Sequence, residues 1–392
     1  MTDYLDEALE LFEYTQELRR DFHRHPELGF QEIRTGGIVA RELNTLGLEV
    51  TTGIGKTGVI ALLEGKEPGP TALLRFDMDA LPIHEETGAV YASQNPGLMH
   101  ACGHDGHTAI GLTVARLLQA HRDELAGTIK FVFQPAEEGL GGAEAMIKDG
   151  ILENPRPDIS LALHLWNEKP LGWIGAAGGP VMAAAEIFRI RVVGKGGHGA
   201  VPQLAVDPVL AAAQIITAVQ SIVSRNVSPL QSAVVSVTTM RSGGAFNVIP
   251  PEVELQGTIR TFDPEVRQRV LERFNQVVSG VGGALECQVE VDVKSITPAV
   301  SNDPELATRF LKTIACLLPE SKLITDYKTM GSEDMAFIMR EIPGCFFFIG
   351  SANPEQGLDA AHHHPRFDFD ERALSQGAAV MAAVASEYLS KE

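Results

Sequence analysis

The sequence predicts an α/β protein in which a mixed sheet with helices on both faces is interrupted by a small inserted α+β domain. Three observations predict this fold. Short apolar runs alternate with amphipathic helical segments in the first half of the chain. The order changes to β-α-β-β-α-β at about Ala184. The mixture of helices and strands then returns after about Ile296.

The first part of the chain begins with helices and continues with alternating strands and helices. Apolar residues recur at helical spacing over residues 5–22, and Pro26 ends this pattern. A second helix is expected over about 35–46, because Gly47 is a favourable C-terminal stop. The remaining elements expected here are strands 58–63, 71–76, 128–133 and 159–165, and helices 107–120 and 142–148.

The middle of the chain predicts a complete small domain of the ferredoxin-like type. Asp207-Pro208 and Asp263-Pro264 each place a helix N-cap before a proline in the first turn. We expect residues 1–183 and 297–392 to form the larger domain and residues 184–296 to be inserted into it. The elements expected from residue 184 on are strands 186–193, 233–240, 253–262, 285–293 and 345–349, and helices 207–224, 264–281, 304–317, 333–340 and 371–389.

Composition excludes several classes of partner. The formal net charge is −19 and no Lys/Arg-rich run is present, which argues against binding to nucleic acid or to an anionic membrane. The N-terminus lacks a signal-peptide pattern, and no apolar stretch approaches the roughly 18 residues of a membrane span. The four cysteines are scattered, which predicts no disulfide framework. We therefore expect a cytoplasmic protein.

Two acidic residues follow the predicted strand 71–76. Asp77 and Asp79 leave this apolar strand two residues apart. In open α/β sheets ligands bind beyond the carboxyl ends of strands, and buried acids there are costly unless they are paired or bind a metal. A solvated turn with an Asp cap is the alternative for this pair taken alone.

The segment from His100 to His107 contains three histidines, Cys102 and an aspartate within eight residues. Thiolate and imidazole are the usual ligands of zinc and related transition metals. The glycines in this segment let the backbone bend so that neighbouring side chains can converge. The density of ligand types predicts a metal site.

Three further groups follow predicted strands. Glu137 and Glu138 are adjacent and point in different directions, so one can bind metal while the other accepts a proton from water. His164 ends a strand, although a lone histidine there is more often a core residue. A run of three histidines, 362–364, follows the last strand. Together, five groups with ligand chemistry are predicted to lie at one edge of one sheet.

The inserted domain contributes a glycine-rich loop, 194–199, that matches neither phosphate-binding fingerprint. His198 is its distinctive residue. Asn247 and Arg260 are further polar candidates in apolar surroundings, and Arg260 could pair bidentately with a carboxylate. Ordinary loop and strand polarity is the alternative for both.

Taken together, these motifs resemble the di-metal amidohydrolase family that includes aminoacylases, hippurate hydrolases and plant auxin-conjugate hydrolases. The family's fold is a zinc-exopeptidase-type catalytic domain with an inserted ferredoxin-like lid or dimerisation domain. The resemblance extends over nearly the whole chain. It rests on the ordered segments 20–28, 77–82, 99–107, 134–139, 195–202, 246–250, 257–262, 331–334 and 363–371.

The resemblance implies a metal centre and a general base. Glu137 is implied to be the general base, and Asp79 an acid that orients the site. The family usually has an apolar residue before the C-terminal ligand, where this chain has His362, so His362 and His364 are alternatives for that position. The implied ligands of two divalent ions are Cys102, His104, Glu138, His164 and His363.

The resemblance also assigns roles in the inserted domain. His198 is implied to polarise the scissile carbonyl, in this family often from the partner subunit. Asn247 and Arg260 are implied to position the substrate. The ions are expected to be zinc or manganese, with cobalt or nickel as alternatives, and the assembly a homodimer or homotetramer.

The expected activity is hydrolysis of N-acyl amino acids, of N-acetyl or N-benzoyl type, to a carboxylic acid and a free amino acid. Metal-activated water attacks the amide, and Glu137 transfers a proton to the leaving amine. A dipeptidase or aminopeptidase using the same metals is one alternative. The other is a non-catalytic metal-binding or scaffold protein with a decayed site.

Overall fold

The computed structural model describes residues 3–390, and the chain divides into two compact units. The first unit contains the chain up to Val181, Val300–Lys328 and the chain from Asp334 on. The second unit contains Met182–Ala299 and Thr329–Glu333. The role of residues 184–296 as an inserted lid or dimerisation domain stays a prediction.

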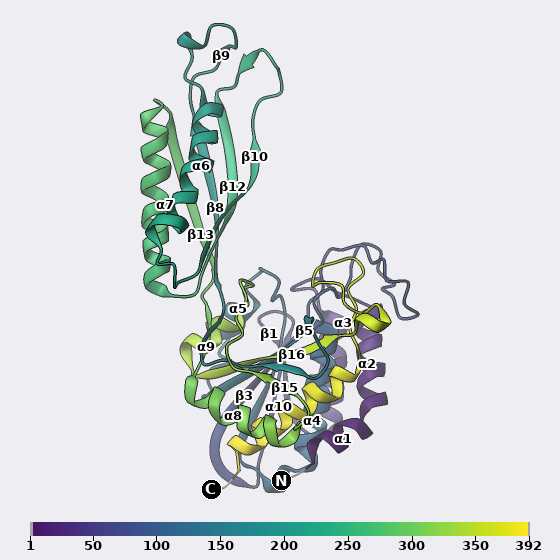
Figure 1. Ribbon diagram of the computed structural model, residues 1–392. Helices are drawn as coiled ribbons and strands as arrows, with labels where there is room; N and C mark the ends of the chain where they lie inside the picture. The colour runs from purple at the N-terminus through teal and green to yellow at the C-terminus, as the bar shows by residue number, and fades with distance from the viewer. Residues whose placement is uncertain (1–2, 391–392) are drawn as a thin grey trace. The chain divides into compact units, whose positions relative to one another are not determined.

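The first unit is built on an eight-stranded mixed sheet with the order β1-β2-β4-β3-β5-β16-β6-β15 (Figure 1). The central strands β4, β3, β5 and β16 run parallel to one another. Strand β2 pairs antiparallel with β1 and β4, and β6 pairs antiparallel with β16. The strands are β1 (Glu49–Ile54), β2 (Gly58–Glu64), β3 (Glu67–Asp77), β4 (Ala126–Gln134), β5 (Ile159–Pro170), β6 (Trp173–Gly175), β15 (Lys322–Ile324) and β16 (Gly344–Ala352), with a separate pair β7 (Gly179–Met182) and β14 (Val300–Asn302).

Helices cover both faces of this sheet, as the sequence predicted (Figure 1). Helices α4 and α10 pack against each other and against β5 on one face, and α5 and α9 pack together on the other. The helices of this unit are α1 (Tyr4–Glu10), α2 (Phe12–Arg24), α3 (Ile33–Thr45), α4 (His104–Ala120), α5 (Gly142–Lys148), α8 (Pro304–Leu317), α9 (Met335–Glu341) and α10 (Arg372–Tyr388), with short 3-10 turns η1 (Arg122–Glu124) and η3 (Pro354–Gln356).

Side-chain alternation along the central strands places two candidate site residues on the face opposite the main hydrophobic core. Leu161, Leu163 and Leu165 of β5 join the main apolar core with α4 and α10. Because successive side chains point to opposite faces, His164 lies on the other face of the sheet. Arg75 of β3 lies between the core residues Leu74 and Phe76 in the same way. The central strands thus bury apolar side chains on both faces, and His164 and Arg75 lie on the face opposite the main core.

The first unit corrects three local predictions. The helix expected over 5–22 is two helices, α1 and α2, separated at Leu11. No proline or glycine marks this break, so the apolar periodicity could not reveal it. Strand β1 was not predicted. Helix α4 begins at His104 instead of His107, because Gly103, at a φ of 90°, turns the chain into the helix.

The second unit has the element order β8-α6-β10-β12-α7-β13 that the sequence predicts. Its four-stranded sheet is antiparallel with the order β10-β12-β8-β13, and α6 and α7 bury the apolar side chains of one sheet face. The elements are β8 (Ala184–Val193), β10 (Ala233–Arg241), β12 (Glu252–Thr261), β13 (Gln288–Thr297), α6 (Pro208–Asn226) and α7 (Pro264–Ala284), with the ribbon β9 (Gly197–His198) and β11 (Val248–Ile249) and the turn η2 (Pro202–Leu204).

Both predicted N-caps of this unit are confirmed, and one strand is corrected. Asp207 accepts hydrogen bonds from the backbone amides of Val209 and Leu210 at the start of α6, and Asp263 caps α7 in the same way. The strand expected over 285–293 is β13, which is shifted toward the C-terminus. The shift arises because α7 continues to Ala284 and Glu286 then adopts a φ of 60°.

Helix α6 is long and apolar enough to cross a membrane by length and composition alone. Its buried residues, which include Ala211, Ile215, Val219 and Ile222, form one side of the helix and pack into the core of the second unit. This spacing is that of an amphipathic helix on a sheet.

Candidate metal centre

The predicted ligands of the first unit come from five separate places in the sequence. Cys102 ends the long connection between β3 and α4, and His104 begins α4. Glu138 follows β4, His164 lies on β5, and His363 lies in the connection between β16 and α10. Parallel neighbouring strands bring these chain segments to one edge of the sheet.

The structure brings these side chains together with Glu137. Three overlapping groups made up of these side chains alone have one ligand atom per residue within 4.8 Å of one another. The Sγ atom of Cys102 lies 3.6 Å from Nε2 of His164, and Nε2 of His363 lies 3.2 Å from Oε1 of Glu138. The groups are Cys102, His104 and His164; Cys102, Glu138 and His363; and His104, Glu137 and Glu138.

The donor set fits divalent cations. Within residues 3–390, Nε2 of His104 and Oε1 of Glu138 are buried and have no hydrogen bond. His363 is close to Oε1 of Glu138, but not in a hydrogen-bonding direction. Buried polar atoms without partners are costly, and a cation bound between them removes that cost. Thiolate, imidazole and carboxylate together suit zinc, manganese, cobalt or nickel.

Asp79 holds two of the candidate ligands in place. Nδ1 of His104 lies 3.0 Å from the backbone oxygen of Asp79 and 3.2 Å from its Oδ1. The backbone N–H of Glu138 donates to Oδ2 of Asp79 over 3.0 Å. Because Nδ1 of His104 is engaged, the free Nε2 atom is the one that faces the cluster. This geometry is what an orienting acid requires.

Asp77 acts on a different histidine. Oδ1 of Asp77 lies 2.6 Å from Nδ1 of His107, and Nε2 of His107 accepts a hydrogen bond from the backbone N–H of Leu165 over 2.9 Å. Both ring nitrogens of His107 are thus engaged, so His107 is unsuited to bind metal although it lies close to His104. Its hydrogen bond with Leu165 instead holds strand β5 in place next to His164.

A buried arginine links the two acidic regions of the site. Arg75 is 1% exposed and donates from Nη1 to Asp77 over 2.6 Å and from Nη2 to Asp334 over 3.2 Å. Its Nε donates to Gln134 over 2.8 Å. The backbone N–H of Asp334 in turn donates to Oε1 of Glu137 over 3.3 Å. Arg75 therefore supports the residue that orients the candidate base.

Sequence reasoning did not assign roles to Arg75, Asp334 or the Asp77–His107 pair. The available signal was a single basic residue inside the apolar strand 71–76.

Burial opposes ionisation of Asp77, but His104, Arg75 and His107 together hold the pKa of that carboxyl well below its usual range. Asp77 is therefore a fixed negative charge beneath the cluster.

The run of three histidines places only its middle member against Glu138. The backbone N–H of His363 donates to Ala101 over 2.7 Å, and His363 adopts a φ of 65°, which histidine tolerates better than most residues. Nε2 of His362 accepts from the backbone N–H of Asn167 over 3.1 Å. Nδ1 of His364 accepts from the backbone N–H of Arg366 over 3.0 Å. His363 is therefore the member that lies in a candidate ligand group.

The remaining predicted residues belong to the second unit. His198 and Asn247 are exposed and lie on or beside the β9–β11 ribbon, where the N–H of Gly199 donates to the backbone oxygen of Asn247 over 2.8 Å. Nδ1 of His198 accepts from the N–H of Ala200 over 3.0 Å. Arg260 is half-buried on β12, and burial lowers its pKa while Glu186 opposes that shift.

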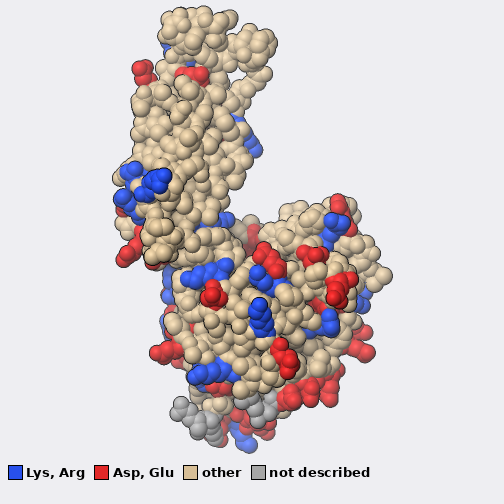
Figure 2. Space-filling model, in the orientation of Figure 1, with Lys and Arg blue, Asp and Glu red and all other residues tan. Residues whose placement is uncertain are grey.

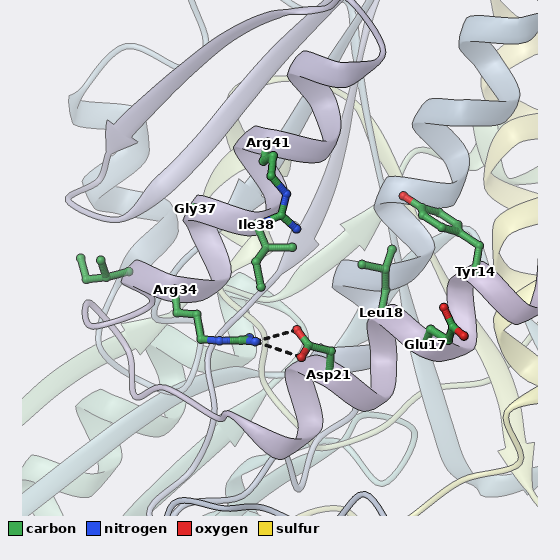
Figure 3. Close-up of a pocket in the computed structure, with 9 residues that line it drawn as sticks. Tyr14, Glu17, Leu18, Asp21, Arg34, Gly37, Ile38 and Arg41 are labelled. Carbon is green, nitrogen blue, oxygen red and sulfur yellow. Dashed lines mark hydrogen bonds and ion pairs between the residues drawn. The ribbon is translucent and has the colours of Figure 1, made fainter.

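A surface groove on the first unit is a different feature. It has a volume of about 670 Å³ and lies between α2 and α3 (Figure 3). Nη2 of Arg34 already pairs with both carboxylate oxygens of Asp21 there, each over 2.9 Å. The groove is lined by no cysteine or histidine, so it does not have the donor chemistry of the cluster described above.

Comparison with known proteins identifies the family. The model of peptidase family M20/M25/M40 matches residues 73–387. The chain belongs to this family. N-acetylcysteine deacetylase of Bacillus subtilis (strain 168) is 41% identical over 375 residues, which cover 95% of this chain and 94% of that protein. Thermostable carboxypeptidase 1 of Saccharolobus solfataricus is 36% identical over 390 residues, 98% of each chain.

A solved structure of a family member is also similar over the whole chain. The Bacillus subtilis YXEP protein, described as a dinuclear metal binding peptidase from the M20 family, superposes with a TM-score of 0.85. It is 36% identical, and the alignment covers 97% of this chain and 99% of that one. The family assignment confirms the resemblance seen in the sequence and makes the chain a metal-dependent hydrolase of amide bonds.

Metal binding is expected to strengthen as the pH rises. Burial, followed by Glu138, raises the pKa of the Cys102 thiol, and the neighbouring side chains of Cys102 and Glu138 raise the pKa of His363 to about 10. The metal-free chain therefore holds protons that a cation must displace. Competition with a chelator between about pH 6 and pH 8 should show affinity rising with pH. An affinity that is constant, after correction for the chelator's own protonation, would contradict this expectation.

Proposed function

We propose that the chain hydrolyses N-acyl amino acids of the N-acetyl or N-benzoyl type to a carboxylic acid and a free amino acid. The observation that carries this proposal is the position of Glu137. Its carboxylate lies within 4.8 Å of candidate ligand atoms of His104 and Glu138, and the N–H of Asp334 orients it. A carboxylate held beside a cation site is the arrangement that hydrolytic attack by water needs.

Two divalent ions are proposed to occupy the cluster, zinc or manganese first and cobalt or nickel as alternatives. Bound there, they supply Lewis acidity that lowers the pKa of water and polarises a carbonyl oxygen. The ligands proposed to hold them are Cys102, His104, Glu138, His164 and His363.

The protein's own residues then move one proton. Glu137 accepts a proton from the attacking water as the C–O bond forms at the amide carbon. The same carboxyl group gives that proton to the amide nitrogen as the C–N bond breaks. Asp334 and Arg75 keep the carboxylate oriented in both steps. Water is consumed, and the products are the acid and the amine.

The second unit is proposed to close over the site as a lid and to contribute His198. Because Nδ1 of His198 accepts a backbone hydrogen bond, its proton resides on Nε2. An N–H donor on an exposed loop suits a developing oxyanion. His198 acts within its own chain or in a partner subunit. Asn247 and Arg260 are proposed to position the carboxylate of the amino acid.

A homodimer or homotetramer joined through the second unit is part of the proposal. Strand β10 forms one edge of the sheet, and Met240 near its end is 43% exposed. Exposed apolar side chains beside an unpaired strand edge are typical of self-association surfaces. Sedimentation equilibrium tests this part, and a monomer at micromolar concentration would contradict it.

A small-molecule substrate in the cytoplasm fits the remaining observations. Figure 2 shows acidic and basic side chains interspersed over the first unit on the face drawn, without separation by sign. The net charge of −19 also argues against nucleic acid. All four cysteines are free thiols, which suits a reducing compartment.

Replacement of the candidate base tests the proposed chemistry. In Glu137→Gln the side chain keeps its shape but cannot accept a proton. We therefore expect kcat to fall by about 10²-fold to 10⁴-fold. Metal content, measured by elemental analysis, should be unchanged. Glu144→Gln, an exposed position on α5, is the matched control and should retain full activity. Retained turnover in Glu137→Gln would remove Glu137 from its proposed role.

A hydrolysis screen tests the substrate class against the peptidase alternative. Apo protein restored with each of the four metals is offered N-acetyl and N-benzoyl amino acids and dipeptides with a free amine. An N-acyl substrate has no ammonium beside the scissile carbonyl to be repelled by the cations. We expect kcat/KM at least about tenfold higher for the N-acyl series. A preference for dipeptides would favour a dipeptidase or aminopeptidase.

A further inference from the structure

His362 is half-buried and lies next to the candidate ligand Cys102. Nδ1 of His362 lies 3.8 Å from Sγ of Cys102. We propose that His362 is a positioning residue that donates a hydrogen bond from Nδ1 to the thiolate of Cys102 and thereby tunes the metal centre. The inference rests on the proposed metal binding by Cys102.

The tautomer of His362 follows from a backbone contact. The N–H of Asn167 donates to Nε2 of His362 over 3.1 Å. A backbone N–H is always a donor, so Nε2 must be unprotonated. In a neutral imidazole the proton then resides on Nδ1. The nitrogen that faces the sulfur of Cys102 is therefore the one that carries hydrogen.

This tautomer also excludes His362 as a metal ligand. An Nδ1 atom that carries a proton has no lone pair to offer a cation, and Nε2 is occupied by the amide of Asn167. The ring of His362 lies beside the candidate metal centre but cannot coordinate a cation there. His362 can act there only through Cys102 or through packing.

The ring of His362 is fixed by aromatic neighbours on several sides. Its centroid lies 4.8 Å from that of Trp166 and 5.1 Å from that of Phe367, at interplanar angles of 34° and 35°. The ring of His164, another candidate ligand, meets it edge-on at 5.2 Å and 78°. A ring packed in this way cannot turn Nδ1 away from Cys102 without displacing its neighbours.

The side chain of Asn167 anchors the segment that carries His362. Its Nδ2 donates to the backbone oxygens of Ala360 over 2.8 Å and Asp368 over 2.9 Å. Asn167 thus holds both ends of this segment with its side chain and holds His362 with its backbone. The ring of His362 is therefore held at two points, by the anchored backbone of its own segment and by the hydrogen bond from the N–H of Asn167 to Nε2. Together these contacts fix the position of Nδ1.

The chemical consequence concerns the charge on sulfur. A thiolate in a buried site loses the hydrogen bonds that water would supply. An N–H group directed at sulfur supplies one of them and withdraws electron density from the metal–sulfur bond. Loss of this donor should raise the energy of the sulfur electrons. Loss of the contact that positions Cys102 should weaken metal binding.

A matched pair of variants isolates the donor. In His362→Asn the side-chain amide nitrogen takes the place of Nδ1, so the donor to Cys102 is kept while the acceptor for Asn167 is lost. In His362→Leu both are lost. His364→Asn is the control, because its amide oxygen can still accept from Arg366 as Nδ1 of His364 does. Each protein is loaded with Co²⁺, and the thiolate-to-cobalt absorption band and the cobalt dissociation constant are measured.

The expected result is a shift of the band to longer wavelength in His362→Leu, with a dissociation constant raised by about 10-fold to 100-fold. His362→Asn should keep the band near its wild-type position, and His364→Asn should match wild type in both measurements. Equal bands in wild type, His362→Leu and His362→Asn would overturn the proposal. Loss of a whole cobalt equivalent in both His362 variants would also overturn it, because His362 would then be a ligand.

The same measurement separates this inference from the proposed function. A wild-type protein that binds cobalt without a thiolate-to-cobalt band would remove Cys102 from the ligands, and the proposed centre would fail with it. If the wild type shows the band and the His362 variants show it at the same wavelength, the proposed centre stands and only the role of His362 is overturned. Should His362→Leu fail to fold, as judged by circular dichroism, His362→Gln replaces it, since its amide lies at the position of Nε2 and not of Nδ1.

Discussion

The site depends on two carboxylates that leave β3 two residues apart and bind different parts of the cluster. Asp79 contacts His104 and the backbone of Glu138, whereas Asp77 contacts His107 and Arg75. Without these contacts the imidazoles of His104 and His107 would lose the hydrogen bonds that orient them. The orientation of His104 and the position of the Glu138 backbone are therefore set by hydrogen bonds within the protein.

Two networks in this unit balance buried charges with opposite charges. Arg75 compensates Asp77 and Asp334 beneath the candidate centre. Arg19, which is 0% exposed, pairs with Asp105 and Asp368, each over 2.8 Å. Removing one partner of such a buried pair typically costs about 3–5 kcal/mol. The second network ties α2 to the first turn of α4 and to the segment that carries His363, so it holds two sources of ligands together.

Much of the fold and of the candidate centre could be predicted from the sequence, because the signals are local. Apolar alternation and periodicity located the central strands and most helices, and ligand-rich segments followed those strands. The partner of a buried group is not a local property. Arg75 was visible only as a basic residue in an apolar strand, and nothing in the sequence showed that it contacts Gln134, Asp77 and Asp334.

The histidine run shows the same limit in a smaller region. Three adjacent residues with the same chemistry are distinguished in the sequence only by the family resemblance, which implies His363. Hydrogen bonds to Asn167 and Arg366 occupy His362 and His364 and leave His363 beside Glu138. The roles of His198, Asn247 and Arg260 depend on how the second unit approaches the first, which neither local pattern nor the structure of each unit determines.

The central claim is that distant side chains of the first unit share two cations. Elemental analysis of the chain after metal loading and removal of loosely bound ions tests it most directly. The account predicts two ions per chain in the wild type, fewer in Cys102→Ser, and an unchanged number in Cys316→Ser, where an exposed free thiol is replaced. A wild-type chain that retains no ion, or a Cys102→Ser variant that retains both with undiminished affinity, would contradict it.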